Sequence, residues 1–77
     1  MRDLVEYLAK ALVDRPDEVN VEEFEEDDGT VVFEVTVADD DVGKVIGRNG
    51  RTVNALRTVI RAAAVRENRR VLVDVVD

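Results

Sequence analysis

The chain lacks cysteine, histidine and tryptophan, and its 77 residues include only one proline and three aromatic residues. Without cysteine there is no disulfide, thiolate nucleophile or cysteine-based zinc site. Without histidine there is no Ser–His or Cys–His pair and no imidazole metal ligand. The composition therefore favours a binding module over an enzyme, and we predict no catalytic residue, no metal, no cofactor and no small-molecule substrate.

Long apolar runs are also missing. No segment approaches the roughly 18 apolar residues of a membrane helix, and the N-terminal sequence MRDLVEYLAK has no apolar stretch typical of a signal peptide. We therefore expect a cytoplasmic protein that makes no contact with the membrane. A length of 77 residues predicts one domain spanning residues 1–77, with a thin core.

Positive charge is scarce overall but unevenly placed, and the formal net charge is −7. Residues 1–41 contain 3 basic and 15 acidic residues, whereas residues 42–77 contain 8 basic and 3 acidic residues. Because distant charges are screened within about 8–10 Å in cellular salt, the second half can attract a polyanion locally. The alternative is a helix whose arginine face is simply solvated.

The first half of the sequence predicts a helix followed by two antiparallel strands. Apolar residues recur at helical spacing over residues 3–13, which predicts a helix. Asp3 and Glu6 are expected to form a capping box at its start. Pro16 ends this helix because the residue before a proline resists the helical conformation.

The two strands are predicted to form a hairpin. From residue 19, apolar and polar residues alternate until Phe24, which breaks the alternation. This break predicts a bulge near residues 22–23. An Asp-Asp-Gly turn at residues 27–29 leads into a regularly alternating strand over residues 30–37.

The second half predicts a short helix over residues 40–46, a longer helix over residues 51–67 and a strand over residues 70–76. Aspartates 39–41 are N-cap candidates for the short helix, and Asn68 suits a left-handed cap after the longer helix. The expected buried stripe of the longer helix is Val53, Leu56, Ile60, Ala63 and Ala64. The order α-β-β-α-α-β predicts an α+β fold, with a three-stranded sheet packed on three helices.

The segment between the two helices reads Gly-Lys-Val-Ile-Gly-Arg-Asn-Gly-Arg-Thr-Val over residues 43–53. Glycines at 47 and 50 allow a tight turn and a close approach of a sugar-phosphate backbone. The turn opens onto the N-terminus of the longer helix, whose free N–H groups favour phosphate. Arg57 and Arg61 lie one turn apart on one flank of that helix. Taken alone, the same glycines also suit a purely structural turn between helices.

The motif Val45-Ile46-Gly47-x-x-Gly50, within this order of elements, resembles a type II KH domain. The whole chain resembles the bacterial KhpA-like family of stand-alone KH domains, which implies binding of single-stranded RNA with the Gly-x-x-Gly loop clamping the RNA backbone. The fragments that carry the resemblance are residues 4–7, 12–14, 43–47, 50–52 and 62–71. With the arginines of the helix flank, the candidate RNA-binding residues are Lys44, Val45, Ile46, Gly47, Arg48, Asn49, Gly50, Arg51, Val53, Asn54, Arg57 and Arg61.

The three aromatic residues, Tyr7, Phe24 and Phe33, occupy positions that fit the core. We therefore expect bases to be contacted by apolar packing and hydrogen bonds to their edges, in contrast to the base stacking of an RNA-recognition motif.

The resemblance also implies a homodimer, pairing with a KhpB (Jag, EloR)-like KH protein, and RNA regulation or RNA chaperoning linked to cell shape and to cell wall organisation during envelope growth and division. The alternative function is a protein-interaction module that acts by dimerisation and contacts RNA weakly.

The predicted dimer face on the longer helix is Val59, Ala62, Val65 and Arg66. The competing surface is the outer face of the sheet, with Val32, Leu72 and Val76.

Overall fold

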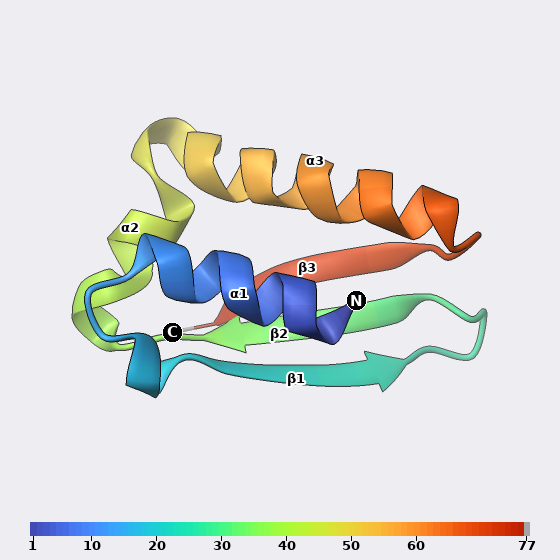
Figure 1. Cartoon of the computed structure of the whole chain (residues 1–77), viewed down its shortest axis with the longest axis horizontal. Helices are drawn as coiled ribbons and strands as arrows, with labels where there is room; N and C mark the ends of the chain where they lie inside the picture. The colour runs from blue at the N-terminus through green and yellow to red at the C-terminus, as the bar shows by residue number, and fades with distance from the viewer. Residues whose placement is uncertain (77) are drawn as a thin grey trace.

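In the computed structural model, which describes residues 1–76, a three-stranded sheet carries three α-helices on one of its faces (Figure 1). The elements are α1 (Arg2–Leu12), β1 (Asn20–Glu25), β2 (Val31–Thr36), α2 (Val42–Ile46), α3 (Arg51–Arg66) and β3 (Val71–Val76). Short 3-10 turns occupy Pro16–Glu18, Asp39–Asp41 and Arg48–Gly50. The predicted α+β class and the order α-β-β-α-α-β are confirmed.

The sheet has the order β1-β2-β3 and is mixed. Strands β1 and β2 pair antiparallel, as predicted, and Gly29 adopts a φ of 89° in the turn that joins them. Strands β2 and β3 pair parallel, so the chain must cross over between them. The crossover consists of α2, the Gly-x-x-Gly loop and α3, which places the motif above one end of the sheet.

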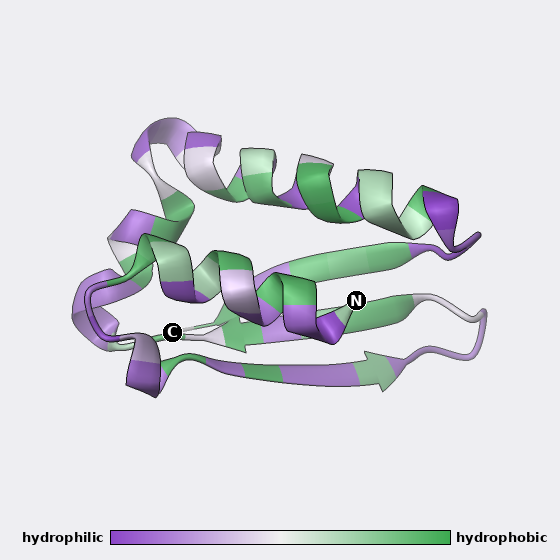
Figure 2. Cartoon of the chain, viewed as in Figure 1, coloured by the Kyte–Doolittle hydropathy of each residue, from purple (hydrophilic) through white to green (hydrophobic). Residues whose placement is uncertain are grey.

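The core lies between the sheet and the helices. Phe33 and Val35 of β2 are fully buried against Val5 of α1, Val45 of α2 and Ile60 of α3. In Figure 2, β3 is mostly hydrophobic and β1 mostly hydrophilic. The sheet therefore has a well-packed side formed by β2 and β3, and an acidic edge formed by β1.

The start of α1 differs from the prediction. The helix begins at Arg2 with Met1 as its N-cap, and no side chain in the described part of the chain caps it. Glu6 instead forms ion pairs with Arg2 and with Lys10, each with an N···O distance of 2.8 Å. The predicted capping box was wrong because Glu6 lies one helical turn from a cation on either side. These two ion pairs compete with the hydrogen bond that the Glu6 side chain would accept from the backbone at the helix start.

The predicted bulge in the first strand is absent from the described residues, since β1 pairs with β2 without interruption from Asn20–Thr36 to Glu25–Val31. Phe24 is out of step in the sequence because it lies on the outer face of the sheet, opposite Val32. An exposed aromatic residue on a regular strand thus gives the same sequence pattern as a bulge.

The prediction that all three aromatic residues are in the core was wrong for two of them. Phe33 is fully buried, but the side chain of Tyr7 is 70% exposed and that of Phe24 is 45% exposed. Tyr7 lies on the outer side of α1, beside Asp3 and Lys10.

The second half follows the prediction with small shifts at the helix ends. Residues 39–41 form a 3-10 turn, α2 begins only at Val42, and none of the three aspartates of this turn caps it with its side chain. The stripe of α3 is buried except for Ala63, which is half-buried. Asn68 has a φ of 56°, so the predicted left-handed cap is confirmed. None of the helices within residues 1–76 has the length and apolar character needed to span a membrane.

Candidate nucleic-acid interface

The backbone of the Gly-x-x-Gly loop is held in unusual conformations. Gly47 has φ 76° and ψ 169°, Asn49 has φ 57° and ψ 26°, and Gly50 has φ 75° and ψ 13°. A Cβ atom on Gly47 would lie 2.2 Å from Oγ1 and 2.8 Å from the backbone N of Thr52. Gly47 is therefore required by the fold itself, because both its φ/ψ region and its surroundings exclude a side chain.

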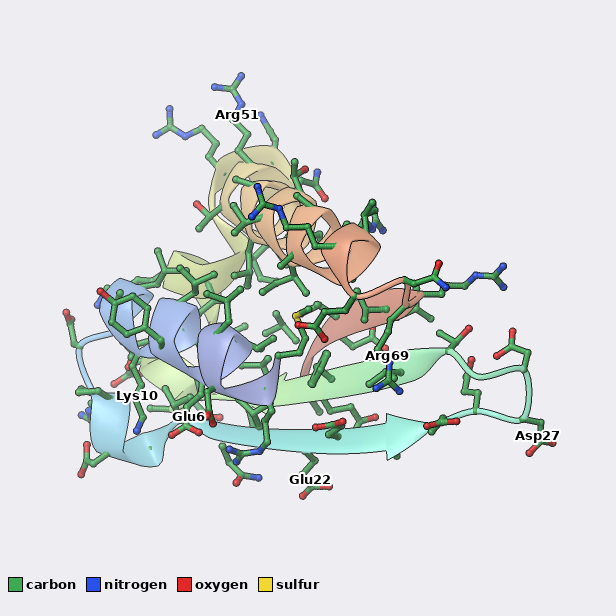
Figure 3. All side chains as sticks on the ribbon, turned by 45° about the vertical axis from the view of Figure 1, so that its right-hand side comes forward. Glu6, Lys10, Glu22, Asp27, Arg51 and Arg69 are labelled. Carbon is green, nitrogen blue, oxygen red and sulfur yellow. The ribbon has the colours of Figure 1, made fainter. Side chains whose placement is uncertain are left out.

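The loop presents positive charge at the start of α3. Gly50 is the N-cap of α3, and no side chain of residues 1–76 accepts hydrogen bonds from the first N–H groups of the helix. Arg48 and Arg51 are exposed and take part in no ion pair within residues 1–76. Figure 3 shows the Arg51 side chain projecting away from the rest of the molecule. This arrangement combines exposed cations with a helix N-terminus, both of which attract phosphate.

A buried carboxylate fixes the start of α2, the helix that leads into the loop. The side chain of Asp41 is 1% exposed and accepts hydrogen bonds from the backbone N–H groups of Asp14 (3.2 Å) and Arg15 (3.0 Å). Lys44 Nζ lies 3.5 Å from Asp41 Oδ1 and also forms an ion pair with Asp14. Asp41 thus ties the segment after α1 to the start of α2.

The partners of Asp41 and Lys44 determine the protonation states of both side chains. Burial alone would raise the pKa of Asp41, but the two backbone donors and the Lys44 ammonium outweigh it and lower the pKa below its usual value. The hydrogen bond with Asp14 raises the pKa of Lys44, although desolvation acts in the opposite direction. Both groups are therefore charged at neutral pH.

Replacing Asp41 by asparagine is expected to lower the melting temperature by several degrees and to flatten its dependence on acid pH. A carboxyl whose pKa falls on folding contributes its full stability above its unfolded pKa of about 3.9. That contribution is lost as the pH falls through the lower folded pKa. Thermal melts between pH 7 and pH 2 measure the effect.

The matched control is Asp39→Asn, which changes an exposed aspartate of the same turn. This variant should keep the acid dependence of the wild type. Superimposable melting profiles for the wild type and Asp41→Asn would show that Asp41 does not brace the fold.

Lys44 differs from Arg48 and Arg51 because it forms ion pairs within the domain. Its ammonium is held between the carboxylates of Asp14 and Asp41, on the side of α2 that faces the end of α1. A phosphate would have to compete with two carboxylates for this ammonium. Lys44 is therefore a poorer phosphate ligand than Arg48 or Arg51.

Three of the predicted RNA-binding residues, Asn54, Arg57 and Arg61, lie along one flank of α3, on the side where β3 forms the edge of the sheet. Arg57 Nε donates a hydrogen bond to the backbone carbonyl of Val73 (3.0 Å), and Arg57 Nη1 to Asn54 Oδ1 (3.4 Å). Arg61 lines a hollow between α3 and β3 together with Leu72. The flank continues from the loop along the strand edge, so the loop and the flank form one surface.

The apolar candidates divide into buried and accessible residues. Val45 is fully buried and Val53 is buried, so both side chains belong to the core beneath the loop. Ile46 is half-buried at the end of α2. Of these three, Ile46 is the side chain available to a ligand, and the other two position the loop.

The predicted dimer face is divided between two sides of α3. Val59 lines an apolar groove between α3 and α1, with Leu8 and Leu12 opposite it. Val65 lies on the β3 side of the helix, and Ala62 and Arg66 are exposed between the two sides. A second copy that covers Ala62 would therefore contact either the α1 side or the β3 side of the helix.

Comparison with known proteins identifies the family. The profile of the family described as KhpA/KhpB, KH domain, matches residues 2–75. The chain belongs to this family. It is 53% identical over 78 residues to the RNA-binding protein KhpA of Halalkalibacterium halodurans, covering 100% of both chains.

Other relatives of this KH domain carry the same description. Identity is 51% over 76 residues to the RNA-binding protein KhpA of Clostridium acetobutylicum, covering 99% of this chain and 100% of the relative. It is 42% over 77 residues to the RNA-binding protein KhpA of Chlamydia caviae, covering 100% of this chain and 97% of the relative. No solved structure gives a significant match. The family resemblance predicted from the motif is confirmed.

The sequence did not reveal the role of Asp41. Three consecutive aspartates predicted helix caps, whereas the structure buries the last of them against backbone N–H groups 26 and 27 residues earlier in the chain. The spacing of residues along the sequence carries no signal for such a distant partner. A Lys three residues after the aspartate, at Lys44, was the one local indication of an ion pair.

Proposed function

We propose that the chain is a single KH domain, residues 1–77, which binds single-stranded RNA through its Gly-x-x-Gly loop and performs no catalysis. The observation that carries the proposal is the loop geometry. Gly47 has no room for a side chain, and among the described residues Arg48 and Arg51 have no ion-pair partner and no side chain caps the start of α3. Phosphates along Gly47–Gly50 would meet both the arginines and the helix N-terminus.

The flank of α3 extends this site for the bases. Asn54 and Arg57 are hydrogen-bonded to each other on this flank, and Ile46 offers an apolar side chain near the loop. Within this proposal Arg48 and Arg51 bind phosphate, and Lys44 orients α2. The description of the relatives as RNA-binding proteins supports the same function for this chain.

Titration with single-stranded RNA at several salt concentrations tests the proposal. For single strands, the logarithm of affinity is expected to fall against the logarithm of salt by about 0.7 for each phosphate neutralised. Arg48→Gln and Arg51→Gln should each reduce that slope by about 0.7 and weaken binding to all sequences alike.

Arg70→Gln is the control, since Arg70 is an exposed arginine at the far end of α3 from the loop. Its slope should match that of the wild type, and double-stranded RNA of equal length should bind more weakly. A slope unaffected by Arg48→Gln and Arg51→Gln would place the RNA elsewhere.

A second candidate function rests on the apolar groove between α1 and α3 and on exposed Ala62. We propose that this surface pairs two copies, or one copy with a KhpB (Jag, EloR)-like protein, in the cytoplasm. We further propose, from the resemblance of the sequence to KhpA-like proteins, a role as an RNA regulator or chaperone in control of cell shape and envelope growth. If pairing is the main task, light scattering will show a dimer, and the RNA affinity in the same titration will be weak.

A further inference from the structure

The outer face of the sheet carries two rows of side chains that run across all three strands. Residues paired across strands point to the same face, and the helices of the described chain lie on the opposite face (Figure 1). The two rows, named here the apolar row and the acidic row, are respectively Phe24, Val32 and Leu72, and Glu22, Glu34 and Asp74.

The apolar row forms a continuous strip. Phe24 is 45% exposed and Leu72 is 42% exposed, and Val32 lies between them almost fully covered. A single exposed apolar residue on a protein surface is ordinary. Phe24 and Leu72 stand in register on either side of the covered Val32, so the row exposes two large apolar side chains on one face of the sheet.

The acidic row places three carboxylates directly opposite one another. Like charges in such positions destabilise a sheet. None of the three forms an ion pair within residues 1–76, and the only polar contact of Glu22 is a long hydrogen bond from Asn20 (3.5 Å). The repulsion in the acidic row is therefore not offset by cations of the fold.

The spacing of the rows suits a helix that lies across the strands. Neighbouring residues in one row are about 4.8 Å apart, and the two rows are about 7 Å apart along the strands. Successive turns of an α-helix are 5.4 Å apart, so one apolar side chain per turn would meet one strand after another. Basic residues on the flank of that helix would then lie over the acidic row.

Charge selects among the possible occupants. RNA and anionic lipid are repelled by the acidic row, and a second copy would bring its own acidic row to the same face. A cationic amphipathic helix matches both rows. We propose that the outer face of the sheet is a docking surface for an amphipathic helix of a partner protein, with its apolar stripe on the apolar row and its Lys and Arg residues against the acidic row.

This surface is separate from the proposed RNA site. Figure 3 shows Glu22 pointing away from the helices on the underside of the sheet, with Arg51 on the opposite side of the molecule. A helix on the outer face would therefore leave Arg48 and Arg51 uncovered. The domain can thus hold an RNA and a basic protein at the same time, and the docking surface does not depend on the RNA proposal.

The test uses a synthetic peptide and the isotope-labelled full chain. The peptide has about 18 residues, since shorter isolated helices are marginal in water, with Leu at helical spacing and Lys on both flanks. Nuclear magnetic resonance titration should shift amide signals of β1, β2 and β3 and leave those of the Gly-x-x-Gly loop unchanged. Glu22→Lys should weaken binding about tenfold or more, and Phe24→Ser by a similar factor.

Asp27→Lys is the matched control, because it changes net charge equally at an exposed hairpin position outside both rows. It should alter affinity by less than about twofold. If Glu22→Lys unfolds the domain, Glu22→Gln replaces it in the test, because this variant removes the negative charge without reversing it. Equal losses for Glu22→Lys and Asp27→Lys, or amide shifts confined to the groove between α1 and α3, would overturn the proposal. So would a dimer that Phe24→Ser dissociates, because the outer face would then belong to a second copy.

Discussion

Gly47→Ala is expected to destabilise the domain strongly and to abolish RNA binding. The new Cβ would lie 2.2 Å from Thr52 Oγ1, 2.7 Å from Thr52 Cβ and 2.8 Å from the backbone N of Thr52. Rotation of the threonine side chain relieves the first contact, but the contact with the backbone of α3 remains. The φ of 76° and ψ of 169° add strain of about 1–3 kcal/mol for a residue with a side chain.

The loss is large relative to the stability of such a domain. At about 0.05–0.15 kcal/mol per residue, a small domain has only a few kcal/mol in total. We therefore expect a fall of 10 °C or more in the melting temperature, at roughly 4–8 °C per kcal/mol. Thermal unfolding followed by circular dichroism measures the change.

Gly43→Ala is the matched control for Gly47→Ala. A Cβ on Gly43 would have no neighbour within 4 Å among the described residues outside its own helical turn, and the residue lies in α2. Alanine there should stabilise the helix by about 0.5–1 kcal/mol. If Gly47→Ala and Gly43→Ala melt alike, the fold does not require the strained conformation at Gly47.

Arg48→Asp combined with Asn49→Asp is expected to weaken RNA binding on the order of a hundredfold while the fold is retained. Two carboxylates at the start of α3 are compatible with the helix dipole, and Asp tolerates the left-handed conformation of Asn49. The same carboxylates repel phosphate from the loop. Fluorescence anisotropy with labelled single-stranded RNA gives the affinity, and circular dichroism reports on the fold.

The control exchanges the same residue types at the other end of α3. Asn68→Asp with Arg70→Asp changes net charge equally, and Asn68 is also left-handed, with a φ of 56°. This variant should lose only the part of the affinity that depends on overall charge. Similar affinities for the two double variants would show that the loop is not the clamp.

The sequence was sufficient to predict the fold because its strongest signals are local. Alternation in β2, helical spacing in α3 and the glycines of the loop each act within a few residues. The register of the hairpin follows from the turn at Gly29. The parallel pairing of β2 with β3 is then the result of a crossover that is long enough to contain two helices.

The features missed by the sequence depend on contacts between distant residues. Burial of Asp41 needs N–H groups of another segment, and the pairing of Glu22 with Glu34 needs the exact strand register. Exposure of Tyr7 and Phe24 was missed because aromatic residues are assigned to the core by type. The candidate phosphate-binding part of the site was predictable, since its residues are consecutive in the chain.

The crossover between β2 and β3 has a consequence for the order in which the domain is assembled. Val31 pairs with Val71, a separation of 40 residues, and the Gly-x-x-Gly loop lies between them. The β1–β2 hairpin can close by itself, but β3 cannot join the sheet until α2, the loop and α3 have brought the chain back. We therefore expect the hairpin to form first and the sheet to be completed only after the chain has turned between α2 and α3. A nascent chain that ends before β3 leaves one edge of β2, over Val31–Thr36, without its partner strand.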